Sequence, residues 1–268
     1  MDTAEVDIIK YKTGDCRHLI DIVVREEPLD IIINGEKKYF CMRMPGMDWE
    51  LAIGLLYNEG IINSLNDIEK FDIDKDRISF EIKGEITGKE KKIYSSSGGT
   101  FSDEIIAPFD LGHAIDRTRT IERAHSMRPN VTFGVDEIFS LQKTFFEMQK
   151  NFDKTGGTHA SAFYSSNGEL IAFAEDVGRH NALDKCMGIA IKSDVFKNIS
   201  LVMLSSRISF EMIKKSFRTG ACVVAGVSAP TSAAIQAAKD LNMTLIGFLR
   251  DGRFNVYSHY ERISGIDV

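Results

Sequence analysis

Between residues 135 and 257, short apolar runs alternate with longer amphipathic stretches, and this alternation restricts the possible fold more than any other feature. Short apolar runs are typical of buried strands, and apolar residues at every third or fourth position are typical of helices. Strands that alternate with helices favour a layered α/β domain with a parallel core, in which ligands bind at the carboxyl ends of the strands. The predicted helices are 135–150, 180–192, 210–218 and 232–241, and the predicted strands are 160–164, 170–174, 201–204, 222–227, 244–249 and 253–257.

The first third of the chain has a different pattern, rich in strands with one clear helix. Asn34-Gly35 predicts a hairpin turn between strands 29–33 and 38–42, and residues 77–82 alternate like a half-exposed strand. We expect Asp48 to be the N-cap of a helix that ends at about Asn58, before Gly60. The change of pattern predicts two domains, a β-rich one over residues 1–130 and an α/β one over residues 131–268.

Charge and cysteine content exclude several classes of protein. The net charge is −6, which disfavours general nucleic-acid binding, although residues 205–268 carry eight Lys/Arg against five Asp/Glu and are the better place for an anionic ligand. The four cysteines are too scattered for a C-x-x-C pair, a zinc knuckle or a disulfide framework, so we expect a reducing cytoplasm. An acidic N-terminus and the lack of a long apolar run predict neither a signal peptide nor a membrane span.

Four segments carry polar residues that packing alone does not explain, and most of them follow predicted strands. Paired glycines and hydroxyl groups let backbone amides approach an anion, and an arginine at a helix start can bind phosphate in a bidentate manner. We therefore expect a single ligand cleft. The four segments are Thr155–Ser161, Glu175–Lys185, Ser205–Ser209, and Val227–Ser232 with Gly247–Asn255.

Ordinary structural roles are open for each of these segments. The glycine pair before His159 could form a tight turn with a structural histidine, and the segment around Arg179 could be a capped helix start with a solvated ion pair. The serine-rich segment could be a plain N-cap. Arg250 and Arg253 carry the inference of a nucleotide, since guanidinium groups beside aromatic rings suit phosphate and base, whereas aromatic residues in strands are more often core. Neither G-x-G-x-x-G nor G-x-x-x-x-G-K-[ST] occurs.

At these segments the sequence resembles the FdhD family of sulfur-carrier accessory proteins, which are required for active formate dehydrogenase. The resemblance runs from about Glu27 to Tyr257, and its most specific part is the block Asp176–Lys185, DVGRHNALDK. The other matching stretches are Glu27–Leu29 with Asn34-Gly35, Pro45-Gly46 through Glu59–Ile62, Thr155–Ala160, Ser228–Ser232, and Gly247-Phe248 with Arg250 and Arg253.

The resemblance implies a fold like that of cytidine deaminases, a homodimer, and transfer of sulfur from a cysteine desulfurase to a molybdenum or tungsten bis(pyranopterin guanine dinucleotide) cofactor. That cofactor is then delivered to formate dehydrogenase. The places that would hold zinc in a deaminase read His159-Ala160-Ser161 and Pro230–Ala234, without the glutamate and the thiolates, so zinc deamination is not expected.

One departure from the family pattern affects its chemistry directly. The family's persulfide loop reads S-S-C-G-x-C-G, and here Ser97 and Thr100 stand at the two cysteine positions of an otherwise aligned loop. Only a thiolate attacks a sulfane sulfur and holds it, so this loop cannot carry a persulfide. We expect the small polar stretch 94–100 to be mobile, with an ordinary surface linker as the alternative. Cys186 and Cys222 are expected to be inert core residues.

Two hypotheses of different class follow. The first is a formate dehydrogenase accessory protein that binds the guanine dinucleotide, or a GDP-like part of it, and has either lost sulfur transfer or moved it to another thiol. Its expected binding residues are Arg179, His180, Arg207, and the segment Phe248, Leu249, Arg250, Asp251, Gly252 and Arg253. The second is a metal-free nucleotide-processing enzyme that uses His159 with Asp176 or Glu175 as acid and base.

Overall fold

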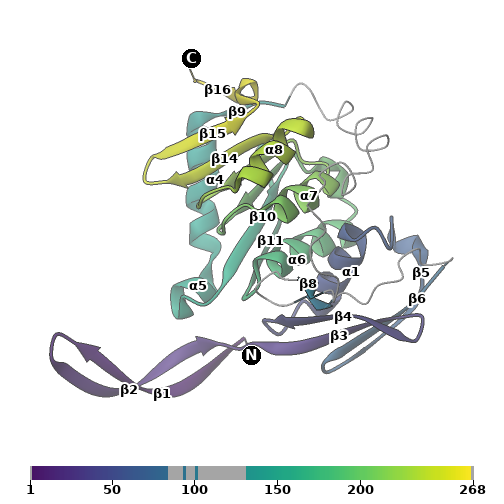
Figure 1. Cartoon of the computed structure of the whole chain (residues 1–268), viewed down its shortest axis with the longest axis vertical. Helices are drawn as coiled ribbons and strands as arrows, with labels where there is room; N and C mark the ends of the chain where they lie inside the picture. Colours follow the sequence, from purple (N-terminus) through teal and green to yellow (C-terminus); the bar gives the residue numbers. More distant parts are fainter. Residues whose placement is uncertain (1, 84–92, 95–99, 102–130, 267–268) are drawn as a thin grey trace.

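The computed structural model describes residues 2–83, 93–94, 100–101 and 131–266 of the chain (Figure 1). The C-terminal half is a mixed six-stranded sheet in the order β11-β10-β12-β13-β14-β15. Only β12, β13 and β14 pair in parallel, while the strands on either side are antiparallel hairpins. These strands are β10 (His159–Tyr164), β11 (Leu170–Asp176), β12 (Leu201–Leu204), β13 (Val223–Gly226), β14 (Thr244–Arg250) and β15 (Arg253–Ser258).

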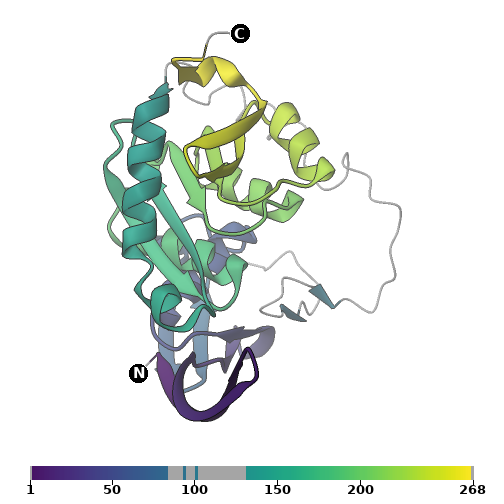
Figure 2. The ribbon, with the colours of Figure 1, turned by 90° about the vertical axis from the view of Figure 1, so that its left-hand side faces the viewer.

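Helices cover both faces of this sheet, as the alternating pattern predicts (Figure 2). Successive side chains of each strand point to opposite faces of the sheet. Leu201 and Met203 of β12 therefore pack with α4, whereas Val202 and Leu204 pack in the cluster that contains α6 and α7. The predicted helix 135–150 is interrupted at Gln149, which separates α4 from the short α5. The helices are α4 (Val135–Met148), α5 (Lys150–Thr155), α6 (Arg179–Lys192), α7 (Phe210–Arg218) and α8 (Ser232–Asp240).

The N-terminal part contains a four-stranded sheet in the order β4-β3-β6-β5 and the helix α1 (Asp48–Asn58). The strands are β3 (Glu27–Ile33), β4 (Glu36–Arg43), β5 (Ile68–Asp74) and β6 (Arg77–Ile82). Asn34 and Gly35 both have positive φ, which confirms the predicted turn. The prediction of Asp48 as N-cap is wrong. Met47 is the N-cap, and the Asp48 carboxylate accepts hydrogen bonds from Arg43 Nε and Nη2 at 2.8 and 2.9 Å.

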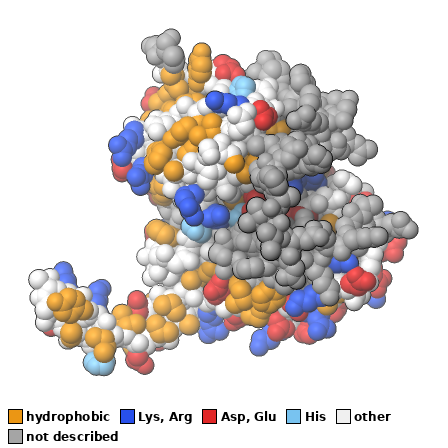
Figure 3. Space-filling view, in the orientation of Figure 1, with side chains coloured by type: hydrophobic (Ala, Val, Ile, Leu, Met, Phe, Trp, Pro, Cys, Tyr) orange, Lys and Arg blue, Asp and Glu red, His pale blue; other side chains and the backbone are white. Residues whose placement is uncertain are grey.

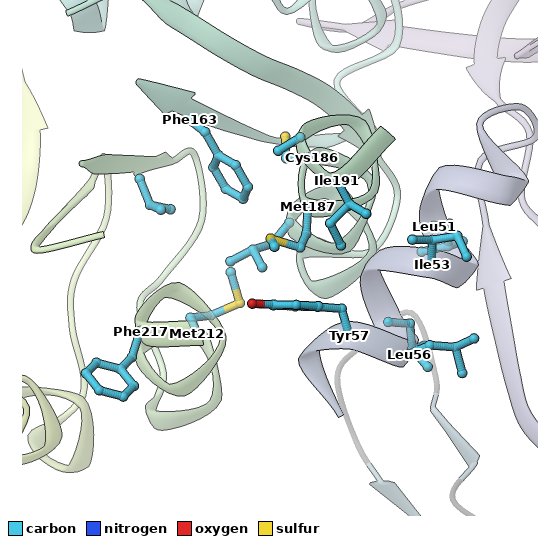
Figure 4. Packing of buried hydrophobic residues seen from close by; sticks show 14 of the residues in the cluster. Leu51, Ile53, Leu56, Tyr57, Phe163, Cys186, Met187, Ile191, Met212 and Phe217 are labelled. Atoms are coloured by element: carbon cyan, nitrogen blue, oxygen red, sulfur yellow. The ribbon is translucent and has the colours of Figure 1, made fainter. Parts of the chain in front are cut away.

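Helix α1 joins the two parts of the chain by packing on α6 at very short range. A Cβ built on Gly54 of α1 would lie 1.8 Å from the carbonyl oxygen of Asp184 in α6. Likewise, a Cβ on Gly188 of α6 would lie 2.0 Å from the carbonyl oxygen of Glu50 in α1. Figure 4 shows Tyr57 of α1 extending toward the side chains of α6 and α7. The largest apolar cluster therefore includes residues from both sides of the predicted boundary at residue 130.

Three small sheets complete the described chain. β1 (Thr3–Lys12) and β2 (Asp15–Val24) form a long hairpin that the sequence patterns do not predict, and it extends away from the body (Figure 1). β7 (Ile93–Tyr94) pairs with β8 (Thr100–Phe101), and β9 (Phe133–Gly134) pairs with β16 (Ile263–Ser264). No helix within the described residues is long and apolar enough to cross a membrane.

Candidate functional site at the carboxyl edge of the sheet

The predicted ligand segments meet at one edge of the six-stranded sheet. β12, β13 and β14 run in parallel and end there, and their neighbour β10 is antiparallel, so its first residue, His159, lies at the same edge. Asp176, the last residue of β11, is the register partner of His159. The Ser205 hydroxyl accepts a hydrogen bond from Ala160 N at 2.8 Å, which ties the loop after β12 to the start of β10. This edge is where ligands bind in open α/β sheets.

Two arginines and two histidines gather at this edge. His159 is subject to the positive charges of Arg179 at the start of α6 and of Arg207 after β12. Burial and then these two guanidinium groups lower the pKa of His159 below its usual value. Burial and the charge of Arg207 likewise lower the pKa of Arg179. A site that disfavours its own positive charges is stabilised by a bound anion.

Several buried donors at this edge form no hydrogen bond within the described residues, and they are the best candidates for binding a ligand. The Nε of Arg179 and the hydroxyls of Ser161 and Ser209 are buried and form no hydrogen bond within the described part of the chain. A buried donor without an acceptor costs free energy, so such groups are usually found where a ligand or ordered water completes them. Guanidinium and hydroxyl donors suit an oxyanion such as phosphate.

His180, one of the expected binding residues, lies beside a carboxylate of α7. Its Nε2 lies 3.0 Å from Glu211 Oε2 on α7, and the histidine lowers the pKa of that carboxyl. The negative charge of Glu211 also acts on Arg179, and so it partly offsets the positive charge of the site. Sequence reasoning missed Glu211, although its position in the first turn of the helix that follows Ser205–Ser209 could have indicated it.

Asp176, at the end of β11 just before α6, has mainly a structural role. Asp176 is fully buried and 2.7 Å from Lys185 Nζ. It accepts further hydrogen bonds from Met44 N, Gly178 N and Asn181 Nδ2 at 3.1, 2.9 and 2.9 Å. These contacts therefore tie α6 to the chain that follows β4.

Glu175 has a structural role as well. Its carboxylate accepts hydrogen bonds from Asn151 N, Phe152 N and Thr158 Oγ1 at 2.9, 2.8 and 2.8 Å, which caps the start of α5. With Glu175 and Asp176 both occupied, neither carboxylate is placed to exchange a proton with a substrate. These contacts argue against an enzyme that uses His159 with either acid.

A second buried ion pair links α6 and α7 near the site. Asp184 of α6 is paired with Lys215 of α7 and accepts a hydrogen bond from Asn58 Nδ2 of α1 at 2.7 Å. Burial raises the pKa of Asp184, and the charge of Lys215 opposes this shift. The pair joins three helices, α1, α6 and α7, and so holds the helix start that carries Arg179 and His180. Sequence patterns do not reveal it, because the three residues are far apart in the chain.

The predicted arginine segment forms the tip of the β14–β15 hairpin. Asp251 and Gly252 make the turn with φ of 56° and 69°, and Arg250 is half exposed beside it. Phe248 has a positive φ of 54°, and its amide donates to Ser228 O at 3.1 Å. Leu249 is fully buried, and its carbonyl accepts a hydrogen bond from Gln142, so its side chain belongs to the core. Since β14 lies two strands from β12, this tip is displaced from Arg207 by roughly 10 Å across the sheet.

The substituted loop lies only partly within the described chain. Thr100 is the first residue of β8 and is the backbone partner of Tyr94, whereas Ser97 lies outside the described residues. The strand β7 that precedes the loop lies beside β4. No group of three His, Cys, Asp or Glu side chains among the described residues is arranged to hold a metal ion.

The four cysteines differ in their exposure to solvent. Cys16 is exposed, and the other three cysteines are buried. Burial raises the pKa of Cys41 to about 12 and that of Cys186 well above its usual value. The expectation that Cys186 and Cys222 are core residues is therefore confirmed.

Comparison with known proteins assigns the family. A family model described as FdhD/NarQ matches residues 24–264, which is most of the chain. The chain belongs to the FdhD/NarQ family. Among its relatives, "Sulfur carrier protein FdhD" of Sulfolobus acidocaldarius is 36% identical, with 98% of this chain and 99% of the relative covered. The protein of the same name from Thermoplasma acidophilum is 37% identical over 91% of this chain and 87% of the relative.

A solved structure confirms that the FdhD/NarQ chain has a known α/β fold. The crystal structure of a candidate formate dehydrogenase accessory protein from Desulfotalea psychrophila superposes with a TM-score of 0.76 at 22% identity. It covers 98% of this chain and 100% of the other. The layered α/β architecture and the β-rich N-terminal part are therefore confirmed.

Proposed function

We propose that this FdhD/NarQ protein is an accessory protein for formate dehydrogenase maturation that binds the guanine dinucleotide part of the molybdenum cofactor at the carboxyl edge of its sheet. The observation that carries the proposal is the buried Nε of Arg179, which forms no hydrogen bond within the described residues and lies near Arg207 and His159. The bis(pyranopterin guanine dinucleotide) is the cargo of this protein, and its diphosphates are the anions that such a donor set accepts.

Each group in the proposed site has a separate role. Arg179 and Arg207 bind phosphate oxygens, and the unpaired hydroxyls of Ser161 and Ser209 donate to the same anion. His159 supplies an N–H donor while remaining neutral, because its pKa is lowered. Arg250 and Arg253, on the displaced hairpin tip, would bind a more distant part of the ligand, such as a second phosphate or the base.

Sulfur transfer through the substituted loop is not part of this proposal. A persulfide forms when a thiolate attacks the outer sulfur of the desulfurase persulfide, and the desulfurase thiolate leaves. Ser97 and Thr100 provide no thiolate for that step. Cys16, the exposed thiol, is the alternative carrier, and without it the protein serves as a cofactor chaperone.

The partners follow from the same proposal. A cysteine desulfurase would supply sulfur, formate dehydrogenase would receive the cofactor, and the protein would act in the cytoplasm as a homodimer. The names of the relatives and of the solved structure support the sulfur-carrier and formate dehydrogenase parts of this statement.

Calorimetric titration with GDP tests the binding site. We expect the wild type to bind, and Arg179→Ala and Arg207→Ala each to weaken binding by roughly ten- to a hundredfold, because each removes a charged hydrogen bond worth about 1.5–3 kcal/mol. Arg250→Ala tests the hairpin separately. Arg17→Ala is the matched control, since Arg17 is an exposed arginine on the β1–β2 hairpin. No heat from the wild type, or equal losses in the control, would refute the site.

Mass spectrometry after incubation with a desulfurase and labelled cysteine tests the carrier role. Wild type and Cys16→Ser are compared. Label on the wild type alone would assign the carrier to Cys16, and no label on either protein would support a chaperone without sulfur transfer. Label on a buried cysteine would contradict both versions.

A further inference from the structure

β5 is the last strand of the N-terminal sheet, and its outer edge pairs with no other strand among the described residues (Figure 1). In an edge strand, alternate backbone N–H and C=O groups point away from the sheet and can pair with another chain. β5 spans seven residues and contains no proline, so each of its residues carries an amide N–H. Edges of this kind accept an extended segment of another protein as an additional strand.

The apolar face of this sheet continues onto β5, beyond the cover of α1. Phe71 and Ile73 are the register partners of Phe80 and Ile78, which are buried in the cluster that contains α1. Directly paired residues share a face of the sheet, yet Phe71 and Ile73 are 52% and 49% exposed. The ring of Trp49 on α1 lies 6.3 Å from that of Phe71. Together, Trp49, Phe71 and Ile73 form an apolar ledge beside the open edge.

The opposite face of the same edge is acidic. Asp72 and Asp74 alternate with the two ledge residues of β5, so they point to the other side of the sheet. Lys70, the one base of β5, is ion-paired with Glu81 at 3.5 Å. Arg77 lies opposite Asp74 across the ladder without forming an ion pair with it. Figure 3 shows acidic side chains, with basic ones among them, at the lower right of the molecule, where Figure 1 places β5 and β6.

These charges decide which kind of strand can be added. In a twofold pairing of β5 with β5 of a second copy that kept the apolar residues on one face, the Asp72 and Asp74 carboxylates of the two strands would face one another. Like charges directly opposite each other are destabilising, and natural proteins use charged edge strands to prevent such pairing. A strand with basic side chains at the same positions would be attracted instead.

We propose that the β5 edge is a docking site for an extended segment of a partner protein in which apolar residues alternate with lysine or arginine. The backbone of that segment would pair with the open edge of β5. Its apolar side chains would lie on the ledge beside Phe71 and Ile73, and its basic side chains would face Asp72 and Asp74 on the other side of the sheet.

The expected complex is weak and transient. One added strand of seven residues is about 24 Å long and buries less than the roughly 1,200 Å² of a stable interface, so we expect micromolar or weaker affinity. Lys192 lies over the Trp49 ring at 5.4 Å, but it is ion-paired with Glu50 at 2.7 Å, which neutralises the base nearest the ledge. Because the attracting carboxylates are exposed, the affinity should fall as salt is added.

Fluorescence anisotropy of a dye-labelled peptide that alternates lysine and valine tests the docking site on the full chain. We expect saturable binding that weakens with salt, and much weaker binding of a peptide that alternates glutamate and valine. Phe71→Ser should weaken binding roughly tenfold, because the exposed half of the ring is covered in the complex. Phe152→Ser is the matched control, since Phe152 is 47% exposed on α5, away from β5. No binding by the wild type, or an equal loss in the control, would overturn the proposal.

Charge reversal tests which side of the strand faces the acids. Asp72→Lys combined with Asp74→Lys should weaken binding of the lysine–valine peptide roughly tenfold or more, and should strengthen binding of the glutamate–valine peptide. The matched control is Glu5→Lys combined with Asp7→Lys, which makes the same change of charge on the β1–β2 hairpin and should do neither. Equal effects of the two double variants would show attraction by net charge alone and would overturn the docking site.

Hydrogen exchange followed by mass spectrometry tests the pairing of the backbone. With the lysine–valine peptide bound, amide exchange over residues 68–74 should become slower. Binding without this protection would overturn strand addition. Protection that appears without peptide and increases with protein concentration would assign the edge to a second copy and would also overturn the proposal. Calorimetry with GDP should be unchanged in Phe71→Ser, so this inference and the proposed nucleotide site hold or fail independently.

Discussion

The contact between α1 and α6 makes a sharp prediction for Gly188→Ala. The new Cβ would lie 2.0 Å from the carbonyl oxygen of Glu50, and both the oxygen and its carbon belong to the backbone of α1. The helices must separate by roughly 1.3 Å to restore an ordinary C···O contact of about 3.3 Å. A gap of about 0.5–1 Å already loses a quarter to a half of the dispersion attraction, so this separation loses at least that much along the contact. Because α1 carries the apolar residues that join the two parts of the chain, the loss spreads over the shared core.

The magnitude follows from two opposing effects. Overpacking of a close-packed contact costs about 1–3 kcal/mol, with this steric overlap at the upper end. Replacing glycine with alanine inside a helix returns about 1 kcal/mol. We therefore expect Gly188→Ala to lower the free energy of unfolding by about 2 kcal/mol in urea titration. Gly54→Ala should cost about as much, and the double variant should cost less than the sum, since one helix shift relieves both clashes.

Gly134→Ala is the control. Its φ is −72°, and a Cβ there would meet its nearest atoms at 3.7 and 3.9 Å, which is ordinary contact. We expect a change of less than about 0.5 kcal/mol. If Gly188→Ala were as stable as this control, the close crossing would not be a constraint on the fold, and the reasoning above would be refuted.

Three further predictions concern the site and the thiols. Lys185→Met should lower the free energy of unfolding by about 3–5 kcal/mol in urea titration, since Asp176 is left as a buried charge, and Asp176→Asn added to it should recover part of the loss. NMR titration should place the pKa of His159 below 6.5, and Arg179→Ala should raise it only partly, because burial is the larger cause. The native state then binds fewer protons than the unfolded state, so this group reduces stability as pH falls through 6.5, and a pKa at or above 6.5 would contradict it. Labelling of native protein with a thiol reagent should modify Cys16 alone, and rapid labelling of a second cysteine would show that the buried thiols are accessible.

Most of the secondary structure of the C-terminal half could be predicted because it depends on local patterns. The helix 210–218 and the strand 201–204 have the predicted bounds. The β1–β2 hairpin was missed because its strands do not show the strict alternation of a half-buried sheet: both faces are exposed and carry charged residues.

The sequence by itself determined that the polar segments follow strands and helix starts of one α/β unit, and hence that they meet at one edge of the sheet. Which of those side chains remain free for a ligand was decided only by tertiary structure. Asp176 and Glu175 accept hydrogen bonds from partners such as Met44 and Asn151, whereas the buried Nε of Arg179 has no hydrogen-bond partner among the described residues. Periodicity reports contacts within a few residues, while hydrogen bonds that span more than a hundred residues exist only once helices and sheets have packed. The same reason explains why the sequence could suggest His159 with Asp176 or Glu175 as acid and base, whereas in the folded chain both carboxylates form structural hydrogen bonds.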